Sequence, residues 1–107
     1  MGGYEVEAAQ EVAQWLDALP DRWFGRVERH IDRLEEENVH LGFPYTSQLE
    51  GRLRELRFDL PDGAWRITYV IAGRKILLLT VFRKQRRRES AQIERAKRVA
   101  RGELGDA

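Results

Sequence analysis

Three short segments joined by tight turns predict an antiparallel β-sheet in the second half of the chain. Apolar and polar residues alternate with a period of two from Leu53 onward, and again after the Leu-Pro-Asp-Gly turn at 60–63. A second turn at 72–73 precedes residues 75–82, which are apolar on both sides. Because strands buried on both faces read as continuous apolar runs, this last strand is expected in the middle of the sheet.

The first half of the chain predicts a helical hairpin. After a short strand at 3–7, apolar residues recur every three or four positions over 8–19 and again over 24–34, which is typical of amphipathic helices. Pro20 separates the two stretches, and Asp21 is expected to be the N-cap of the second helix.

A last helix is expected to begin at Ser90, as its N-cap, and to end at Gly102, so that residues 103–107 form a frayed tail. The elements then follow the order β-α-α-β-β-β-α in a single domain that spans residues 1–107. The predicted fold class is therefore α+β: a small antiparallel sheet with an N-terminal helical hairpin and a C-terminal helix.

The composition argues against several classes of protein. The chain has no cysteine, which excludes a disulfide scaffold, thiol catalysis and a cysteine zinc site, and fits the reducing cytoplasm. No apolar run approaches the roughly 18 residues of a membrane span, so no membrane partner is expected. No Asp, Glu and His cluster has the spacing of metal ligands, and no glycine loop suits a nucleotide. We therefore expect neither a metal nor another cofactor.

The net charge of +1 conceals two halves of opposite charge. Residues 1–51 contain four Arg or Lys and eleven Asp or Glu, a net charge of −7, whereas residues 52–107 contain fifteen and seven, a net charge of +8. In the basic half, the apolar strand runs directly into a segment without acidic residues that contains Arg83, Lys84, Arg86, Arg87 and Arg88. Because such a surface binds polyanions by releasing their counterions, we expect a phosphate-rich partner.

The turn at 60–63 also predicts which residues face each other. If Asp59 and Ala64 flank the turn, Arg57 lies opposite Arg66 in the adjacent strand. Two like charges in this position cost a few tenths to about 1 kcal/mol unless an anion lies between them. A functional interpretation places a substrate phosphate there. The alternative is that Arg57 pairs with Glu55 or Asp59 while Arg66 reaches water.

Cleavage of RNA by its own 2′-hydroxyl is a reaction that such arginines could assist. Their guanidinium groups would stabilise the charge on the phosphorane through bidentate contacts. General acid–base catalysis needs a titratable group, for which Lys84 and Glu55 are the candidates. Tyr69 is expected in the core, and His30 and His40 fall in the helical hairpin, away from the basic sheet.

Six segments follow one another along the chain in a recognisable series: residues 11–19, 41–44, 49–57, 65–69, 77–84 and 93–96. Together they resemble the HigB-like branch of the RelE/ParE toxin superfamily. Residues 11–19, before the helical hairpin, resemble the N-terminal part of that branch, and so do residues 41–44 and 49–57. Residues 65–69 resemble its aromatic–Arg–aliphatic–x–Tyr strand. Residues 77–84 and 93–96 resemble its closing strand and last helix, so the likeness spans roughly residues 10–101 in the same order.

The resemblance implies a RelE-like fold and the toxin of a type II toxin–antitoxin pair, acting as a ribosome-dependent mRNA endonuclease. It implies three catalytic residues: Arg57, Arg66 and Lys84. Charge adds a set of expected RNA-binding residues: Arg54, Arg83, Arg86, Arg87 and Arg88. The implied partners are a cognate antitoxin of the helix-turn-helix type, the ribosome and mRNA, with operator DNA bound only through the antitoxin.

Two alternative functions remain open at this point. Gln85 stands where a second lysine is common in the family, and no Tyr or His follows it to match the catalytic Tyr or His of some members. A ParE-like inhibitor of DNA gyrase needs no titratable group, and DNA breaks rather than translation arrest would identify it. A non-toxic binding module that partners a helix-turn-helix antitoxin would instead be harmless when expressed.

Overall fold

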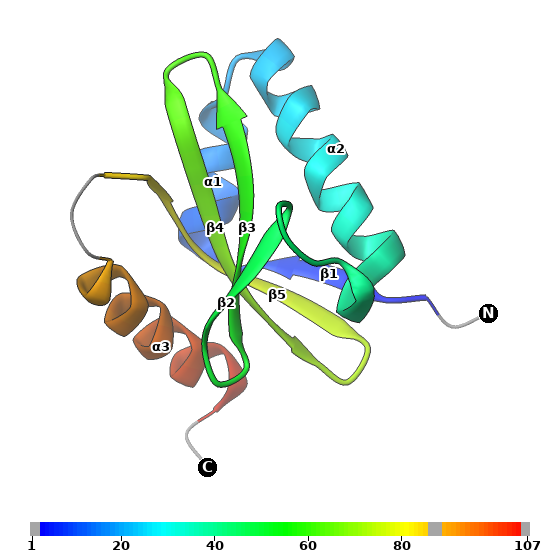
Figure 1. The fold of residues 1–107 in the computed structure, drawn as a ribbon, viewed down its shortest axis with the longest axis vertical. Coiled ribbons are helices and arrows are strands. Elements are labelled where there is room, and N and C mark those ends of the chain that lie inside the picture. The colour runs from blue at the N-terminus through cyan, green and yellow to red at the C-terminus, as the bar shows by residue number, and fades with distance from the viewer. Residues whose placement is uncertain (1–2, 86–88, 106–107) are drawn as a thin grey trace.

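The computed structural model describes residues 3–85 and 89–105, which form a five-stranded sheet. Figure 1 shows helices on both faces of this sheet. The α+β class is confirmed. The elements are β1 (Glu5–Ala8), α1 (Gln10–Ala18), α2 (Asp21–Glu37), the short 3₁₀ turn η1 (Asn38–His40), β2 (Thr46–Glu50), β3 (Leu53–Leu60), β4 (Gly63–Ala72), β5 (Lys75–Arg83) and α3 (Ser90–Leu104).

The sheet has the order β1-β5-β4-β3-β2, so β5 is an interior strand, as its apolar run predicts. The β2–β3, β3–β4 and β4–β5 pairs are antiparallel, but β1 pairs with β5 in parallel, which corrects the expected all-antiparallel sheet. The long helical connection after β1 makes the parallel pairing possible. Strand β2 was not predicted, because this edge strand is mostly polar and lacks a clear alternation.

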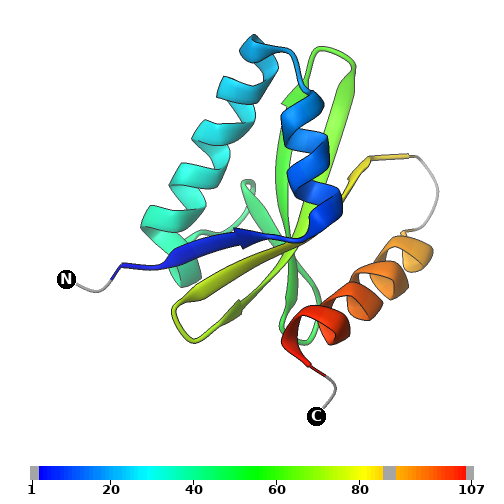
Figure 2. The same ribbon diagram turned by 180° about the vertical axis from the view of Figure 1, so that it is seen from behind.

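The alternation in β3 and β4 directs their side chains to two separate cores. Helices α1 and α2 cover one face of the sheet, where the fully buried side chains include Leu34, Leu56, Ile67 and Tyr69. Helix α3 covers part of the other face, against Leu53, Val70, Leu77 and Leu79. Figure 2, from behind, shows α1 and α2 side by side, with α3 apart from α2. The prediction that Tyr69 lies in the core is confirmed.

The helix ends differ from their predicted positions. The N-cap of α2 is Pro20, and the prediction that Asp21 caps it is wrong, since Asp21 lies in the first turn, where its charge favours the helix dipole. The N-cap of α3 is Glu89 rather than Ser90. This helix continues through Gly102 to Leu104 and ends at Gly105, which adopts a φ of 86°. Residues 103–104 are therefore helical, and residues 106–107 lie outside the described part of the chain.

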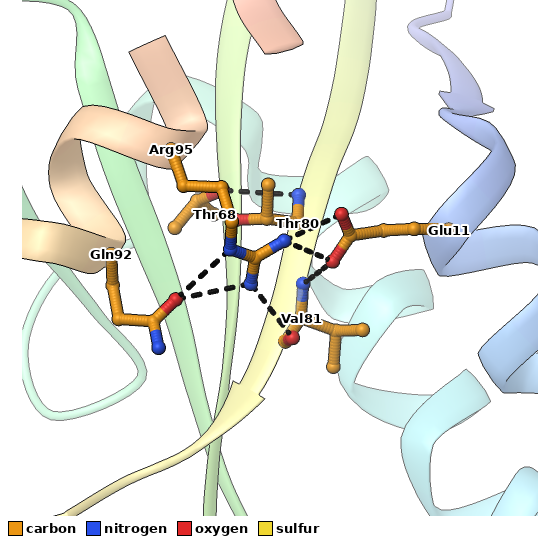
Figure 3. A network of polar contacts seen from close by, with 6 residues as sticks. All are labelled: Glu11, Thr68, Thr80, Val81, Gln92 and Arg95. Carbon is orange, nitrogen blue, oxygen red and sulfur yellow. Dashed lines mark hydrogen bonds and ion pairs between the residues drawn. The ribbon is translucent and has the colours of Figure 1, made fainter. Parts of the chain in front are cut away.

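Side chains from two helices take the place of a strand beside β5. Strand β1 pairs with β5 only as far as Leu78, and beyond it the Val81 N–H donates to the Glu11 carboxylate at 3.0 Å. Both carboxylate oxygens of Glu11 accept from Nη1 of Arg95, at 2.6 and 2.7 Å, and Nη2 of Arg95 donates to the Val81 carbonyl at 3.3 Å (Figure 3). The Glu11–Arg95 pair thus joins α1 to α3. It also provides hydrogen-bond partners for the N–H and carbonyl of Val81, at the edge of β5 beyond β1.

Replacing Arg95 with alanine is expected to lower the free energy of unfolding by about 1–2 kcal/mol, because the charged hydrogen bonds to Glu11 and Val81 are lost at a half-exposed site. Urea unfolding followed by tryptophan fluorescence measures the change. The matched control is Lys97→Ala on the same helix, which removes only the exposed ion pairs with Glu50 and Glu94 and should leave the urea midpoint unchanged. Equal midpoints for both variants would contradict this role of Arg95.

Candidate active site

The β3–β4 hairpin has the predicted register. Asp59 lies opposite Ala64, and Arg57 lies opposite Arg66. These two arginines occupy the face of the sheet on which α3 packs, but nearer the β3–β4 turn than Leu53 and the other residues that α3 covers. The strand pairing alone therefore brings two guanidinium groups together on one face.

A buried carboxylate lies between the two arginines. Glu55 precedes Arg57 by two residues in β3, and its Oε2 lies 3.2 Å from Nη1 of Arg57 and 3.7 Å from Nε of Arg66. Ser47, in β2, donates its hydroxyl to the same oxygen at 2.9 Å. Glu55 is 3% exposed and Arg66 is 5% exposed. The alternative pairing of Arg57 with Glu55 is thus confirmed, whereas the idea that Arg66 reaches water is wrong.

This carboxylate only partly neutralises the cluster, which has two positive charges and one negative charge. Nε of Arg66 and Oε1 of Glu55 have no hydrogen-bond partner among the described residues. Nη1 of Arg66 donates to the Trp65 carbonyl at 2.9 Å. Burial and the neighbouring Arg57 lower the pKa of Arg66 below its usual value, against the effects of Glu55, Glu89 and Asp59. Because the arginine remains charged, an additional anion here would be favourable.

A surface hollow opens beside the cluster. It has a volume of about 220 Å³ and is lined by Pro44, Arg57, Phe58, Asp59 and Arg66. The adjacent Phe43 is 76% exposed, and its ring centroid lies 5.1 Å from the Arg57 guanidinium. Exposed aromatic rings and arginine planes are the surfaces on which unpaired RNA bases stack. Phe43 is not among the site residues predicted from the sequence, although an aromatic residue in a Gly-Phe-Pro loop was a usable signal.

Lys84 lies at the same end of the sheet as the arginine pair. Phe82 is opposite Arg66, and the Lys84 N–H continues this pairing by donating to the Ala64 carbonyl at 2.8 Å. Nζ of Lys84 lies 3.3 Å from a carboxylate oxygen of Glu89. The structure therefore brings the three predicted catalytic residues to one end of one sheet face, with Glu89 pairing the lysine.

The predicted RNA-binding arginines do not form one surface. Arg54 points to the opposite face, where its guanidinium donates to the Tyr69 hydroxyl at 3.3 Å and the Thr46 hydroxyl at 2.9 Å. Arg83 lies beside the β3–β4 turn and donates to the Asp62 carbonyl at 3.2 Å. Arg86, Arg87 and Arg88 lie outside the described residues.

The histidines lie away from this site. His30 stacks on Phe58 with ring centroids 5.6 Å apart, and His40 belongs to η1. Over residues 3–85 and 89–105, no group of three or more His, Asp or Glu side chains could hold a metal ion. In the same residues, no helix is long and apolar enough to cross a membrane.

Comparison with known proteins gives one family and one fold. Residues 14–101 match the model of the family described as phage-derived Gp49-like proteins, DUF891. The structure resembles a chain of the RelBE2 toxin–antitoxin complex of Mycobacterium tuberculosis, with a TM-score of 0.58 and 19% identity over 77% of this chain and 99% of that chain.

It also resembles the isolated RelE toxin of E. coli, with a TM-score of 0.52 and 12% identity over 90% of this chain and 98% of that chain. No curated protein matches the sequence. At these identities the two structures establish a shared fold.

Proposed function

Because the chain belongs to the family of phage-derived Gp49-like proteins, and because its fold is that of RelE, we propose that it is the toxin of a type II toxin–antitoxin pair. We place it in the HigB-like branch, from the motifs in its strands. Its proposed activity is the cleavage of mRNA bound to the ribosome, in the cytoplasm. The observation that carries this proposal is the Arg57–Glu55–Arg66 cluster at the edge of an open hollow.

In the proposed reaction, the 2′-hydroxyl oxygen attacks the adjacent phosphorus, and the bond to the 5′-oxygen of the next nucleotide breaks. Negative charge builds on the phosphorane oxygens, where Arg57 and Arg66 stabilise it. Glu55 holds both guanidinium groups in place before the substrate arrives. Phe43 provides a stacking surface for a base beside the hollow.

Proton transfer to the leaving group is assigned to Lys84. Lys84 can donate a proton to the leaving 5′-oxygen, since its ammonium group lies at the same end of the sheet and is 39% exposed. The paired Glu89 orients the ammonium group. Glu55, the other titratable candidate, is nearly buried and does not line the hollow, so its proposed part is to hold the two arginines rather than to accept the proton of the 2′-hydroxyl. The site would depend mainly on positioning and charge, so the ribosome's hold on the substrate contributes to the rate.

The proposed protein partner is an antitoxin with a helix-turn-helix domain. A segment of it that covers the face with Arg57, Arg66 and Lys84 would block the hollow and neutralise the toxin. The complex of the two chains would bind operator DNA through the antitoxin. One of the similar structures reported above is a toxin–antitoxin complex, which supports a partner of this kind.

Induction of the chain in growing bacteria tests this function. We expect growth arrest within minutes, with new mRNA 5′-ends phased with codons, and neither effect for the double variant Arg57→Ala/Arg66→Ala. The matched control is Arg52→Ala, because Arg52 is exposed at the β2–β3 turn, far from the hollow. Arrest with DNA breaks and intact mRNA would replace the proposal by gyrase inhibition. Harmless expression of the folded wild-type chain would leave only a binding module.

A further inference from the structure

The acidic half of the chain carries a regular row of positive charge on helix α2. Its spacing of four, three and four residues places the side chains within an arc of about 60° on one face of the helix. The row is about 16 Å long, from the rise of 1.5 Å per residue. These are all four of the cationic residues in positions 1–51, and we call them the α2 arginine row: Arg22, Arg26, Arg29 and Arg33.

No carboxylate lies at ion-pair distance from the α2 arginine row in the described part of the chain, whereas Lys75, Lys84, Arg95 and Lys97 all have one. Glu28 and Asp32 are on the same helix but fall outside the arc of the row. Like charges at this spacing destabilise a helix. An anion from another molecule would remove that cost.

The positive charges of the row also affect the pKa of His30, on the same helix. Burial lowers the pKa of His30, and the charges of Arg33, Arg26 and Arg29 lower it further, against Asp59. Arg22, Arg26 and Arg29 are exposed, while Arg33 is half-buried with its guanidinium 4.2 Å from the ring centroid of Tyr45. Three of the four guanidinium groups are therefore directly available to a ligand.

The row borders a concave surface. A hollow of about 440 Å³ is lined by Arg22, Trp23, Arg26, Arg29 and Pro61. Pro61 belongs to the β3–β4 turn, which Figure 1 shows beside the N-terminal end of α2. Guanidinium groups match phosphate oxygens in bidentate pairs, so a hollow with three arginines on one wall suits a phosphate backbone.

The chemistry of the row favours a nucleic acid over a protein. Protein interfaces depend on buried apolar or aromatic anchors. The most exposed large apolar side chains are Phe24, Val39, Phe43, Tyr45 and Leu104. Of these, Phe24 is on the opposite side of α2 from the row, and Tyr45 lies beneath Arg33. The row thus presents regularly spaced charge with few apolar anchors.

We propose that the α2 arginine row binds the sugar–phosphate backbone of a structured RNA segment, different from the strand that is cleaved. This rests on the proposed function, because the cleaved strand occupies the hollow beside Arg57 and Arg66. That hollow is on the face of the sheet on which α3 packs, whereas the row belongs to α2, which covers the other face. The β3–β4 hairpin stands between them, so one chain would hold two RNA segments, one on each side.

The binding experiment uses the full chain, a short RNA hairpin and a single-stranded RNA, with affinities measured by fluorescence anisotropy at several salt concentrations. For Arg22→Gln/Arg26→Gln/Arg29→Gln, hairpin affinity should fall by tenfold or more, and the slope of log affinity against log salt should decrease by about 2–3. Affinity for the single strand should change little. A control variant loses three cations at the opposite end of the sheet, Arg52→Gln/Arg74→Gln/Lys75→Gln, and should keep its affinity for the hairpin.

Unchanged hairpin binding by the row variant, or an equal loss in the control, would overturn the proposal. So would normal RNA binding combined with loss of the antitoxin complex, which would make the row a protein interface. Failure of the proposed function is detected separately, since hairpin binding requires no cleavage. A row variant in which all three positions become lysine tests the bidentate contacts: it should keep the salt slope but bind the hairpin less tightly than wild type.

Discussion

Replacement of Arg66 by alanine is expected to slow ribosome-dependent mRNA cleavage by about 10²–10³-fold, the usual effect of removing one donor that stabilises a developing oxyanion. Arg66 is nearly buried, and its guanidinium is oriented by the Trp65 carbonyl and by Glu55. Little reorganisation would therefore be needed as charge builds on the phosphorane. The measurement is single-turnover cleavage of a ribosome-bound mRNA by purified toxin variants.

Two further variants and a test of folding make this result specific. Arg52→Ala removes an exposed arginine distant from the hollow and should cleave at the wild-type rate. Arg66→Lys keeps the charge without the planar fork and should fall between alanine and wild type. Circular dichroism and urea unfolding of each variant establish that it is folded. Wild-type cleavage by folded Arg66→Ala would remove this arginine from the proposed site.

Replacement of Glu55 by alanine is expected to lower the free energy of unfolding by about 3–5 kcal/mol, as when one partner of a buried ion pair is removed. Arg66 would remain buried next to Arg57, with no carboxylate between them. The Ser47 hydroxyl would also lose its acceptor. Urea denaturation at neutral pH, followed by tryptophan fluorescence, gives the change in unfolding free energy.

A double-mutant cycle separates this electrostatic effect from the loss of packing. Glu55→Ala/Arg66→Ala should be less destabilised than the sum of the two single changes, because removal of both partners leaves no unpaired charge. Additive effects would show that Glu55 and Arg66 are energetically independent. A Glu55→Ala change within about 1 kcal/mol of wild type would contradict a central role for this carboxylate.

Local patterns in the sequence were enough to predict the centre of the candidate site. The Pro-Asp-Gly turn and the alternation on both sides of it predict the pairing of Arg57 with Arg66 without any tertiary information. The same alternation places Arg54 with Leu56 and Phe58, on the opposite face from Arg57. The RNA-binding residues were predicted from charge alone, without regard to the face of the sheet on which each side chain lies. The prediction therefore included Arg54, which donates hydrogen bonds to Tyr69 and Thr46.

Features that depend on long-range contacts were not predictable. The burial of Arg66 results from the packing of neighbouring elements around the sheet, which no local pattern encodes. Strand β2 is stabilised by its pairing with β3, although its own sequence is mostly polar. The α2 arginine row was visible in the sequence, but the net charge of −7 in residues 1–51 concealed it. The net charge of a segment does not show on which face of a helix each charged residue lies.

Because β1 pairs with β5, the sheet can be completed only late in the synthesis of the chain. Glu5 lies opposite Lys75, and Glu11 contacts Arg95 across 84 positions in the sequence. The first strand therefore emerges from the ribosome long before its partner, and such distant contacts slow folding. The β3–β4 hairpin can pair earlier, but the complete sheet must wait for β5. We expect the nascent chain to reach its native fold only when most of it has been translated.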